Sequence, residues 1–354
     1  MLGSERVRAV LVGAEPDRTP VQYHFLGGAH SVLARVGTSM AVAYSSPTSI
    51  ANTQIAAAEM FGHDTAMAPW GCLTVEAQAF GCELDYHDMW YPQVRSRPLT
   101  DTTDLSRLNS IGPDLAGRMP LMIDALAELR RRSDGELFVI AMVVSPFLVA
   151  CELRDMSQLM LDIGLEPTFV AELLDTVADG LGNYVDAIAA SGAVDAIMFE
   201  NAGMGAELLG PHHVETFVRP NHRRLVAKAR AAAPDVFLIE HNCASSPYFT
   251  EIHQTDVDAI SFAVDDLELA AGTAEHGRHQ TLIGSVDHAG LMLNGSPDQV
   301  RGAALRCIER AGERPFILST GCEVPFKAPA ENIAALADAA REASTNQPTR
   351  PLPR

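Results

Sequence analysis

Short apolar runs recur along the chain, and longer segments with helical spacing separate them. Runs that are apolar on both faces are typical of the buried strands of a parallel sheet, and Leu137–Val144 is the clearest of them. The pattern predicts eight strands, at 21–25, 65–70, 137–144, 196–199, 236–241, 260–264, 281–284 and 316–319. The strands at 21–25 and 65–70 carry the weakest pattern.

The segments between these strands have the periodicity and the end signals of helices. A long helix is expected to begin at Pro167 and to stop at Gly192, because proline favours the first helical position and glycine a helix end. Ser296 caps a helix that begins at Pro297 and ends at Gly312 in the same way. The remaining helices are expected at 48–61, 120–132, through Leu225 and Ala233, at 267–274 and at 331–341.

Eight strands that alternate with helices favour a (β/α)8 TIM barrel over a doubly wound sheet. We predict a single barrel domain over residues 1–343, with 1–19 as a short entry segment. Residues 81–118 are rich in proline and aspartate and predict an irregular insertion over one end of the fold, for which a hairpin is one possible form. Residues 344–354 contain three prolines and predict a disordered tail.

Composition excludes several classes of partner. With 26 basic and 45 acidic residues the net charge is -19, so a nucleic acid or an anionic membrane would be repelled. No apolar run approaches ~20 residues, and Met1 to Arg8 lacks the hydrophobic region of a signal peptide. We therefore expect a soluble cytoplasmic protein. Six cysteines are too sparse for a disulfide scaffold, which favours a metal site or catalysis for any that lie together.

A candidate metal site follows the predicted strand 236–241. His241 and Cys243 are two residues apart and can share one face of an extended backbone, and Cys322 follows the strand 316–319. In a barrel the carboxyl ends of all strands meet at one mouth. An imidazole nitrogen and two thiolates suit Zn2+, and three protein ligands leave a position open for catalysis. The alternative is that both cysteines are small buried hydrophobes and His241 is a satisfied polar residue.

Several segments carry a resemblance to a known family. They are Ser145–Ala150, Glu240–Cys243, Leu282–Asp287 and Leu318–Pro325 with Pro329–Ile333. Together they resemble the uroporphyrinogen decarboxylase superfamily and, within it, the branch of methylcobamide:coenzyme M methyltransferases. The resemblance covers most of the chain in the family's order. It implies a barrel fold and a zinc ion held by His241, Cys243 and Cys322.

The activity implied by the resemblance is methyl transfer between a corrinoid and a thiol acceptor. Zinc deprotonates a bound thiol, and two cysteinate ligands leave the metal weakly Lewis-acidic, so the substrate sulfur stays nucleophilic. That sulfur can attack a methyl group on cobalt(III). The chain has no Asp-x-His-x-x-Gly corrinoid signature, because Asp287–Gly290 lacks the spacing. The methyl carrier is therefore expected to be a separate corrinoid protein or free methylcobalamin.

Two acidic residues at predicted strand ends are candidates for catalysis. Glu200 can bind zinc in the absence of a thiol or receive the thiol proton, or it can make a plain hydrogen bond at the barrel mouth. Asp287 can orient His241, or it can cap a loop. Cys72 is a weak further ligand candidate. The cysteines expected to be packing residues are Cys82, Cys151 and Cys307.

Three other functions remain open on the sequence. The same barrel can serve a non-thiol acceptor such as tetrahydrofolate. A uroporphyrinogen decarboxylase-like lyase fits poorly, because Leu26–Ser31 after the first strand has no arginine for the substrate carboxylates. A non-catalytic relative that binds a corrinoid protein would need no metal site.

Overall fold

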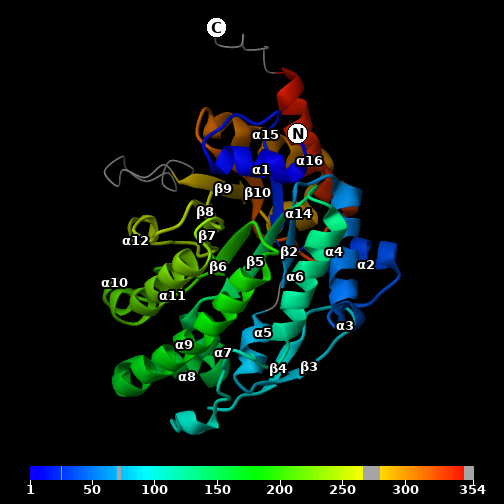
Figure 1. Cartoon of the computed structure of the whole chain (residues 1–354). Coiled ribbons are helices and arrows are strands. Elements are labelled where there is room, and N and C mark those ends of the chain that lie inside the picture. The colour runs from blue at the N-terminus through cyan, green and yellow to red at the C-terminus, as the bar shows by residue number, and fades with distance from the viewer. Residues whose placement is uncertain (25, 70–72, 266–279, 347–354) are drawn as a thin grey trace.

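The computed structural model describes residues 1–24, 26–69, 73–265 and 280–346, and Figure 1 shows a barrel of strands surrounded by helices. The barrel strands are β1 (Val21–His24), β2 (Thr65–Ala68), β5 (Phe138–Val144), β6 (Ala196–Glu200), β7 (Phe237–Asn242), β8 (Ala259–Phe262), β9 (Thr281–Val286) and β10 (Phe316–Glu323). Their order in the sheet is β1-β10-β9-β8-β7-β6-β5-β2, and every pairing is parallel. The predicted (β/α)8 barrel is confirmed.

Asp64 links β1 to β2 at the N-terminal mouth of the barrel. The backbone N–H of Asp64 donates to the Val21 carbonyl at 2.9 Å, and the Val21 N–H donates to Asp64 Oδ2 at 2.8 Å. Arg6 and Arg18 both bond the same carboxylate. The first and second barrel strands are therefore held at the N-terminal mouth by a buried side chain.

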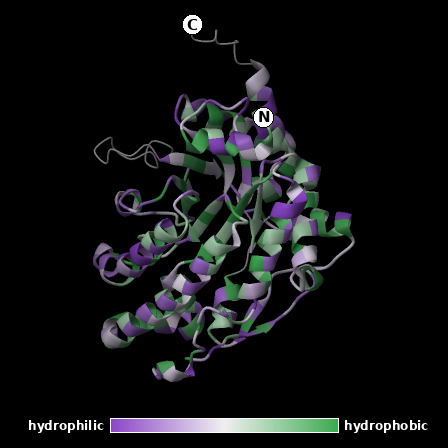
Figure 2. Ribbon diagram, in the orientation of Figure 1, coloured by the Kyte–Doolittle hydropathy of each residue, from purple (hydrophilic) through white to green (hydrophobic). Residues whose placement is uncertain are grey.

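Helices surround the strands, and Figure 2 shows hydrophilic residues along these peripheral helices. They are α1 (Gly3–Leu11), α2 (His30–Val36), α3 (Met40–Ala43), α4 (Pro47–Phe61), α5 (Thr74–Ala79), α6 (Met119–Ser133), α7 (Pro146–Arg154), α8 (Met156–Leu165), α9 (Pro167–Ser191), α10 (Pro211–His213), α11 (Arg219–Ala232), α12 (Phe249–His253), α14 (Gly290–Asn294), α15 (Pro297–Ala311) and α16 (Ala330–Asn346). None of those in the described residues has the length and apolarity needed to cross a membrane.

Predicted helix ends agree with the structure where the end signals are strong. Ser296 forms a capping box with Gln299 at the start of α15, and Gly192 ends α9 with φ 60°. Several helices were not predicted: α1 lies in the expected entry segment, α7 and α8 precede α9, and the short helices α2, α3, α5, α12 and α14 were also missed. The helix expected at 267–274 lies outside the described residues.

The segment 81–118 is only partly irregular. Within 81–118 the strands β3 (Glu83–Asp85) and β4 (Gln93–Ser96) pair antiparallel, so the segment does contain a hairpin. The predicted start of the tail, at residue 344, is too early, because α16 continues to Asn346. Residues 347–354 lie outside the description.

Candidate metal centre

The structure brings the three expected ligands together at the C-terminal mouth. His241 lies in β7, Cys243 follows it directly, and Cys322 lies near the end of β10. Their ligand atoms, one imidazole nitrogen and two sulfurs, lie within 4.8 Å of one another. His241 is fully buried and the two cysteines are partly buried. Segments far apart in the sequence thus converge on one point.

A bulge in β10 positions Cys322. Gln22 of β1 pairs with Ser319, but His24 pairs with Glu323, so β10 uses two extra residues over this interval. Such bulges often re-aim a side chain next to an active site. Gly321 is required within it, because a Cβ there would lie 2.8 Å from Ala263 Cα. The local sequence Thr-Gly-Cys therefore lets β10 bend past β8.

A chain of hydrogen bonds fixes the orientation of His241. Its Nδ1 lies 2.9 Å from Ser261 Oγ, and that hydroxyl lies 3.0 Å from His24 Nε2. His24 Nδ1 lies 3.3 Å from Ser319 Oγ, and its ring centroid is 4.4 Å from that of His241. With Nδ1 bonded to Ser261, the other ring nitrogen is left for the mouth. A metal-binding histidine is commonly held in this manner through its second nitrogen.

The ring nitrogen that faces the mouth lacks a hydrogen bond. His241 Nε2 is buried and has no hydrogen-bond partner within the described residues, although Glu200 Oε2 lies 3.4 Å from it. Buried polar atoms are nearly always bonded, so an orphaned one calls for an explanation. A metal ion bound at Nε2 and at the two sulfurs would provide it. The donor set therefore fits zinc.

Glu200 stands beside the three candidate ligands. It ends β6, and its Oε1 lies 3.8 Å from Cys243 Sγ. Burial raises the pKa of this carboxyl to about 8. The next acidic residue on β7, Glu240, belongs to a different network: its Oε2 lies 2.5 Å from His222 Nε2.

The pKa values of Cys243, Cys322 and His241 depend on one another. A hydrogen bond with Cys322, opposed by burial, lowers the pKa of Cys243 to about 4, and the same bond raises the pKa of Cys322. Burial alone would lower the pKa of His241, but Glu200 and Cys243 raise it to about 9. The hydrogen bond between the two sulfurs therefore favours the thiolate form of Cys243, which is the form that binds a metal ion.

The chain matches the family description "Uroporphyrinogen decarboxylase (URO-D)" over residues 2–343. It belongs to this family. The resemblance predicted from the sequence is therefore confirmed.

Relatives within the URO-D family include methyltransferases. The chain is 26% identical to the methylated-thiol–coenzyme M methyltransferase of Methanosarcina mazei, over 97% of this chain and 90% of the relative. It is 23% identical to the methylcobamide:CoM methyltransferase MtaA of Methanosarcina barkeri, over 95% and 97%. A uroporphyrinogen decarboxylase from Prochlorococcus marinus is 24% identical, over 71% of each chain. Among solved structures, a methyltransferase from Methanosarcina mazei superposes with a TM-score of 0.83 at 22% identity, covering 97% of this chain and 99% of that one.

Of the two roles considered for Asp287, the hydrogen bonds in the structure match the loop cap. Its Oδ1 accepts the N–H groups of Ala289 and Gly290, and its Oδ2 accepts that of Leu291. The carboxylate thus caps the turn that leads into α14, while Ser261 bonds His241 Nδ1. Cys72 lies outside the described residues. The three cysteines expected to pack are buried: Cys82, Cys151 and Cys307.

Sequence reasoning missed three polar residues of this URO-D barrel mouth. Ser261 and His24 are described above, and the third is Glu323, the residue after Cys322. Burial raises the pKa of the Glu323 carboxyl to about 8, and the Tyr91 side chain forms a hydrogen bond with it. Its Oε1 is buried without a hydrogen-bond partner in the described chain. The sequence did offer one indication of its role, because Glu323 directly follows the predicted ligand Cys322.

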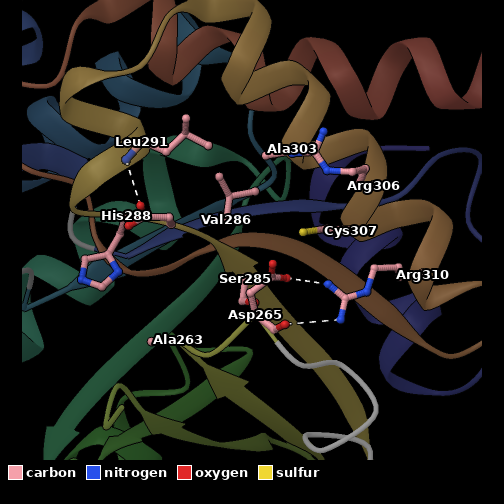
Figure 3. Close-up of a pocket in the computed structure, with 11 residues that line it drawn as sticks. Ala263, Asp265, Ser285, Val286, His288, Leu291, Ala303, Arg306, Cys307 and Arg310 are labelled. Carbon is pink, nitrogen blue, oxygen red and sulfur yellow. Dashed lines mark hydrogen bonds and ion pairs between the residues drawn. The ribbon is translucent and has the colours of Figure 1, made fainter.

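A cavity of about 400 Å³ opens between the ends of β8 and β9 and helix α15. Figure 3 shows Arg310 paired with Asp265 on one side and the His288 ring on the other. The Arg310–Asp265 contact is 2.6 Å.

Proposed function

We propose that this protein is a zinc-dependent methyltransferase that moves a methyl group between a corrinoid and a thiol. The observation that carries the proposal is the convergence of His241, Cys243 and Cys322 at one mouth of the barrel, with their ligand atoms within 4.8 Å. Three protein ligands are the set of a catalytic zinc, which keeps a fourth position open. The names of relatives that align with nearly the whole chain support the same activity.

In this proposal His241 Nε2 and the two cysteine sulfurs hold the metal. When bound, zinc lowers the pKa of a substrate thiol and keeps the sulfur as a thiolate. Ser261 holds the His241 ring so that Nε2 faces the mouth. Glu200, 3.8 Å from Cys243 Sγ, is placed to receive the proton of the incoming thiol at a carboxylate oxygen or to contact the metal before substrate arrives.

The methyl transfer itself needs a second substrate. The substrate sulfur attacks the methyl carbon, a sulfur–carbon bond forms, the cobalt–carbon bond breaks, and its electron pair stays on the cobalt. We propose that the corrinoid is presented at the C-terminal mouth by a separate protein or as free methylcobalamin. The absence of a corrinoid signature from the sequence supports an external carrier.

Metal analysis of the purified protein tests the proposal. We expect about one zinc per chain in the wild type and none in a Cys243→Ser, Cys322→Ser double variant. A Cys151→Ser variant is the matched control, because this cysteine is buried in α7 and has no place in the cluster. Full zinc occupancy in the double variant would refute the metal assignment.

Turnover is tested separately by following the absorbance of methylcobalamin with a panel of thiols. We expect its consumption to require a thiol and to be lost in the double variant. Consumption with tetrahydrofolate but with no thiol would keep the metal centre and replace the acceptor. An empty metal site together with no turnover on any acceptor would favour a non-catalytic corrinoid-protein binder.

A further inference from the structure

Four large apolar side chains gather at the tip of the β3–β4 hairpin. Tyr86, Met89 and Trp90 lie in the turn between the two strands, residues 86–92, and Val42 lies on α3, which is hydrogen-bonded to this turn. Each of the four side chains is 45–53% exposed. Contiguous apolar side chains at a protein surface commonly mark a binding site, whereas single ones need no explanation. These four residues, called the hairpin tip below, are therefore a candidate binding surface.

The backbone of the turn is fixed by the helices that follow β1. The Met40 N–H donates to the Asp88 carbonyl at 2.9 Å, and His30 Nε2 lies 3.0 Å from the Met89 carbonyl oxygen. These contacts join the turn to the N-terminal ends of α3 and α2. The hairpin tip is thus held in place before any ligand arrives, and a surface that is already ordered loses little entropy on binding.

The hairpin tip lies at the C-terminal mouth, near the candidate metal centre. Cys322 is followed by Glu323, whose carboxyl forms a hydrogen bond with the Tyr91 side chain. Tyr91 directly follows Trp90, and its ring packs edge-on against Phe326 with the centroids 4.7 Å apart. Two peptide links and one hydrogen bond therefore connect Trp90 with a proposed metal ligand. Figure 1 shows β3 and β4 at the end of the molecule opposite α1.

The methyl donor of the proposed reaction has to cover this mouth. Its methyl carbon must reach a sulfur at the metal centre, and a corrin is a broad, flat macrocycle, so its edge extends over the rim of the barrel. Four half-exposed side chains of roughly 200 Å² each offer roughly 400 Å² of contact surface. A stable protein–protein interface buries roughly 800 Å² on each partner. The area of the hairpin tip therefore fits a macrocycle better than a protein partner.

Charge favours the same ligand. The side chains of the hairpin tip are uncharged, and the chain carries a net charge of -19, so an anionic partner would be repelled and an uncharged one would not. We propose that the hairpin tip binds the corrin ring of free methylcobalamin, which has no net charge, with the Trp90 indole packed against the macrocycle. This inference rests on the proposed function and names the surface that holds its methyl donor. Tryptophan suits this role, because it offers a large, rigid contact area with only two side-chain torsions to order.

Equilibrium dialysis against methylcobalamin tests the proposal without turnover. The purified protein is dialysed against the corrinoid, and the bound fraction is measured from the visible absorbance of the corrin. We expect Trp90→Ala to weaken binding about tenfold, and Trp90→Phe, which keeps an aromatic ring, to weaken it by at most about threefold. Leu165→Ala is the matched control, because Leu165 is an exposed apolar residue of α8 outside the hairpin tip. This variant should bind like the wild type.

Unchanged affinity in Trp90→Ala would overturn the inference and leave the hairpin tip for another occupant, such as a protein partner. If that variant failed to fold, Met89→Ala would decide the case. We expect it to bind methylcobalamin about threefold more weakly, because it removes one apolar contact, and wild-type affinity would contradict the proposal.

Zinc analysis of the same samples separates this inference from the methyltransferase proposal. A wild type that holds zinc but binds no methylcobalamin would overturn the role of the hairpin tip and leave the metal centre intact, with the methyl group then supplied by a corrinoid protein. A wild type that binds methylcobalamin through Trp90 but holds no zinc would support the role of the hairpin tip and refute the metal assignment.

Discussion

At the N-terminal mouth of the barrel, three aspartates stand immediately before strands. Asp64, Asp195 and Asp258 precede β2, β6 and β8, and each accepts a backbone N–H from the neighbouring strand at 2.7 to 2.8 Å. Their arginine partners are Arg6 and Arg18 for Asp64, Arg8 and Arg130 for Asp195, and Arg230 for Asp258. The same arrangement, an aspartate that bonds a backbone N–H and at least one arginine, thus occurs three times.

The carboxyl groups at the C-terminal mouth have the opposite surroundings. Glu76, Glu200 and Glu323 are buried, and within the described chain none forms an ion pair with arginine or lysine. Burial raises the pKa of Glu76 to about 7 and of the other two to about 8. The same chemical group is therefore paired with arginine at one mouth and has no basic partner at the other, where barrel enzymes place their active sites.

Removal of the Asp64 charge should give the largest loss of stability. An Asp64→Asn variant leaves Arg6 buried and Arg18 nearly so, with their carboxylate replaced by a neutral amide. We expect the free energy of unfolding, measured with guanidinium chloride, to fall by about 3–5 kcal/mol. Asp17→Asn is the control, because Asp17 is 43% exposed and also pairs with Arg6. It should cost at most about 1 kcal/mol, and equal costs would contradict the comparison.

At the C-terminal mouth, the cost of burying a carboxyl without a basic partner should make the free energy of unfolding depend on pH. Burial raises the pKa of Glu76 to about 7, against the hydrogen bond from Val144 and the charge of Arg118. The folded carboxyl holds its proton more tightly than the unfolded one, so the free energy of unfolding should fall as pH rises from about 4.5 to 7. The fall is on the order of 2–3 kcal/mol.

A Glu76→Gln variant should lose this fall. The difference in stability between the variant and wild type should therefore shift in favour of the variant between about pH 5 and pH 8. Glu172→Gln, an exposed position on α9, should leave the pH profile unchanged. A parallel profile for Glu76→Gln and wild type would show that the carboxyl carries no such cost.

The sequence was sufficient for the features that depend on residue type and position along a strand. Runs such as Leu137–Val144 predicted buried parallel strands, and a barrel brings strand ends together, so His241, Cys243 and Cys322 could be joined before any coordinates. The bulge that turns Cys322 inward could not be predicted, because it depends on the pairing of β10 with β1.

The supporting residues of the metal centre were hidden for a different reason. Ser261 and His24 are ordinary polar residues within strands, and only the register of β8 and β1 against β7 shows that they meet His241. The sequence left two roles open for Asp287, and the path of the following turn decides for the loop cap. Helices α7 and α8 were missed because the apolar residues after Pro146 do not show a clear helical periodicity.

Replacement of Ser261 should affect metal affinity more than stability. A Ser261→Ala variant removes the only partner of His241 Nδ1 that the structure describes, at 2.9 Å. We expect zinc affinity, measured by competition with a chromophoric chelator, to fall about 10- to 100-fold. The metal-free protein should lose only about 1 kcal/mol. Ser319→Ala, whose hydroxyl contacts His24 at 3.3 Å instead, should change zinc affinity far less. Equal effects would argue against the orienting role of Ser261.

The smallest loss of stability is expected at the N-terminal mouth, where two arginines pair with Asp195. Arg8 lies 2.8 Å from Asp195 Oδ1, but its side chain is 49% exposed and Arg130 bonds the other oxygen at 2.6 Å. Arg8→Ala should therefore lower the free energy of unfolding by only about 0.5 kcal/mol. Removing Arg130 as well leaves the carboxylate of Asp195 buried without a counter-ion, so the double variant should lose about 1 kcal/mol more than the sum of the single changes. Strict additivity in this cycle would mean that neither arginine compensates for loss of the other, and the contrast with the C-terminal mouth would then rest on Asp64 and Asp258.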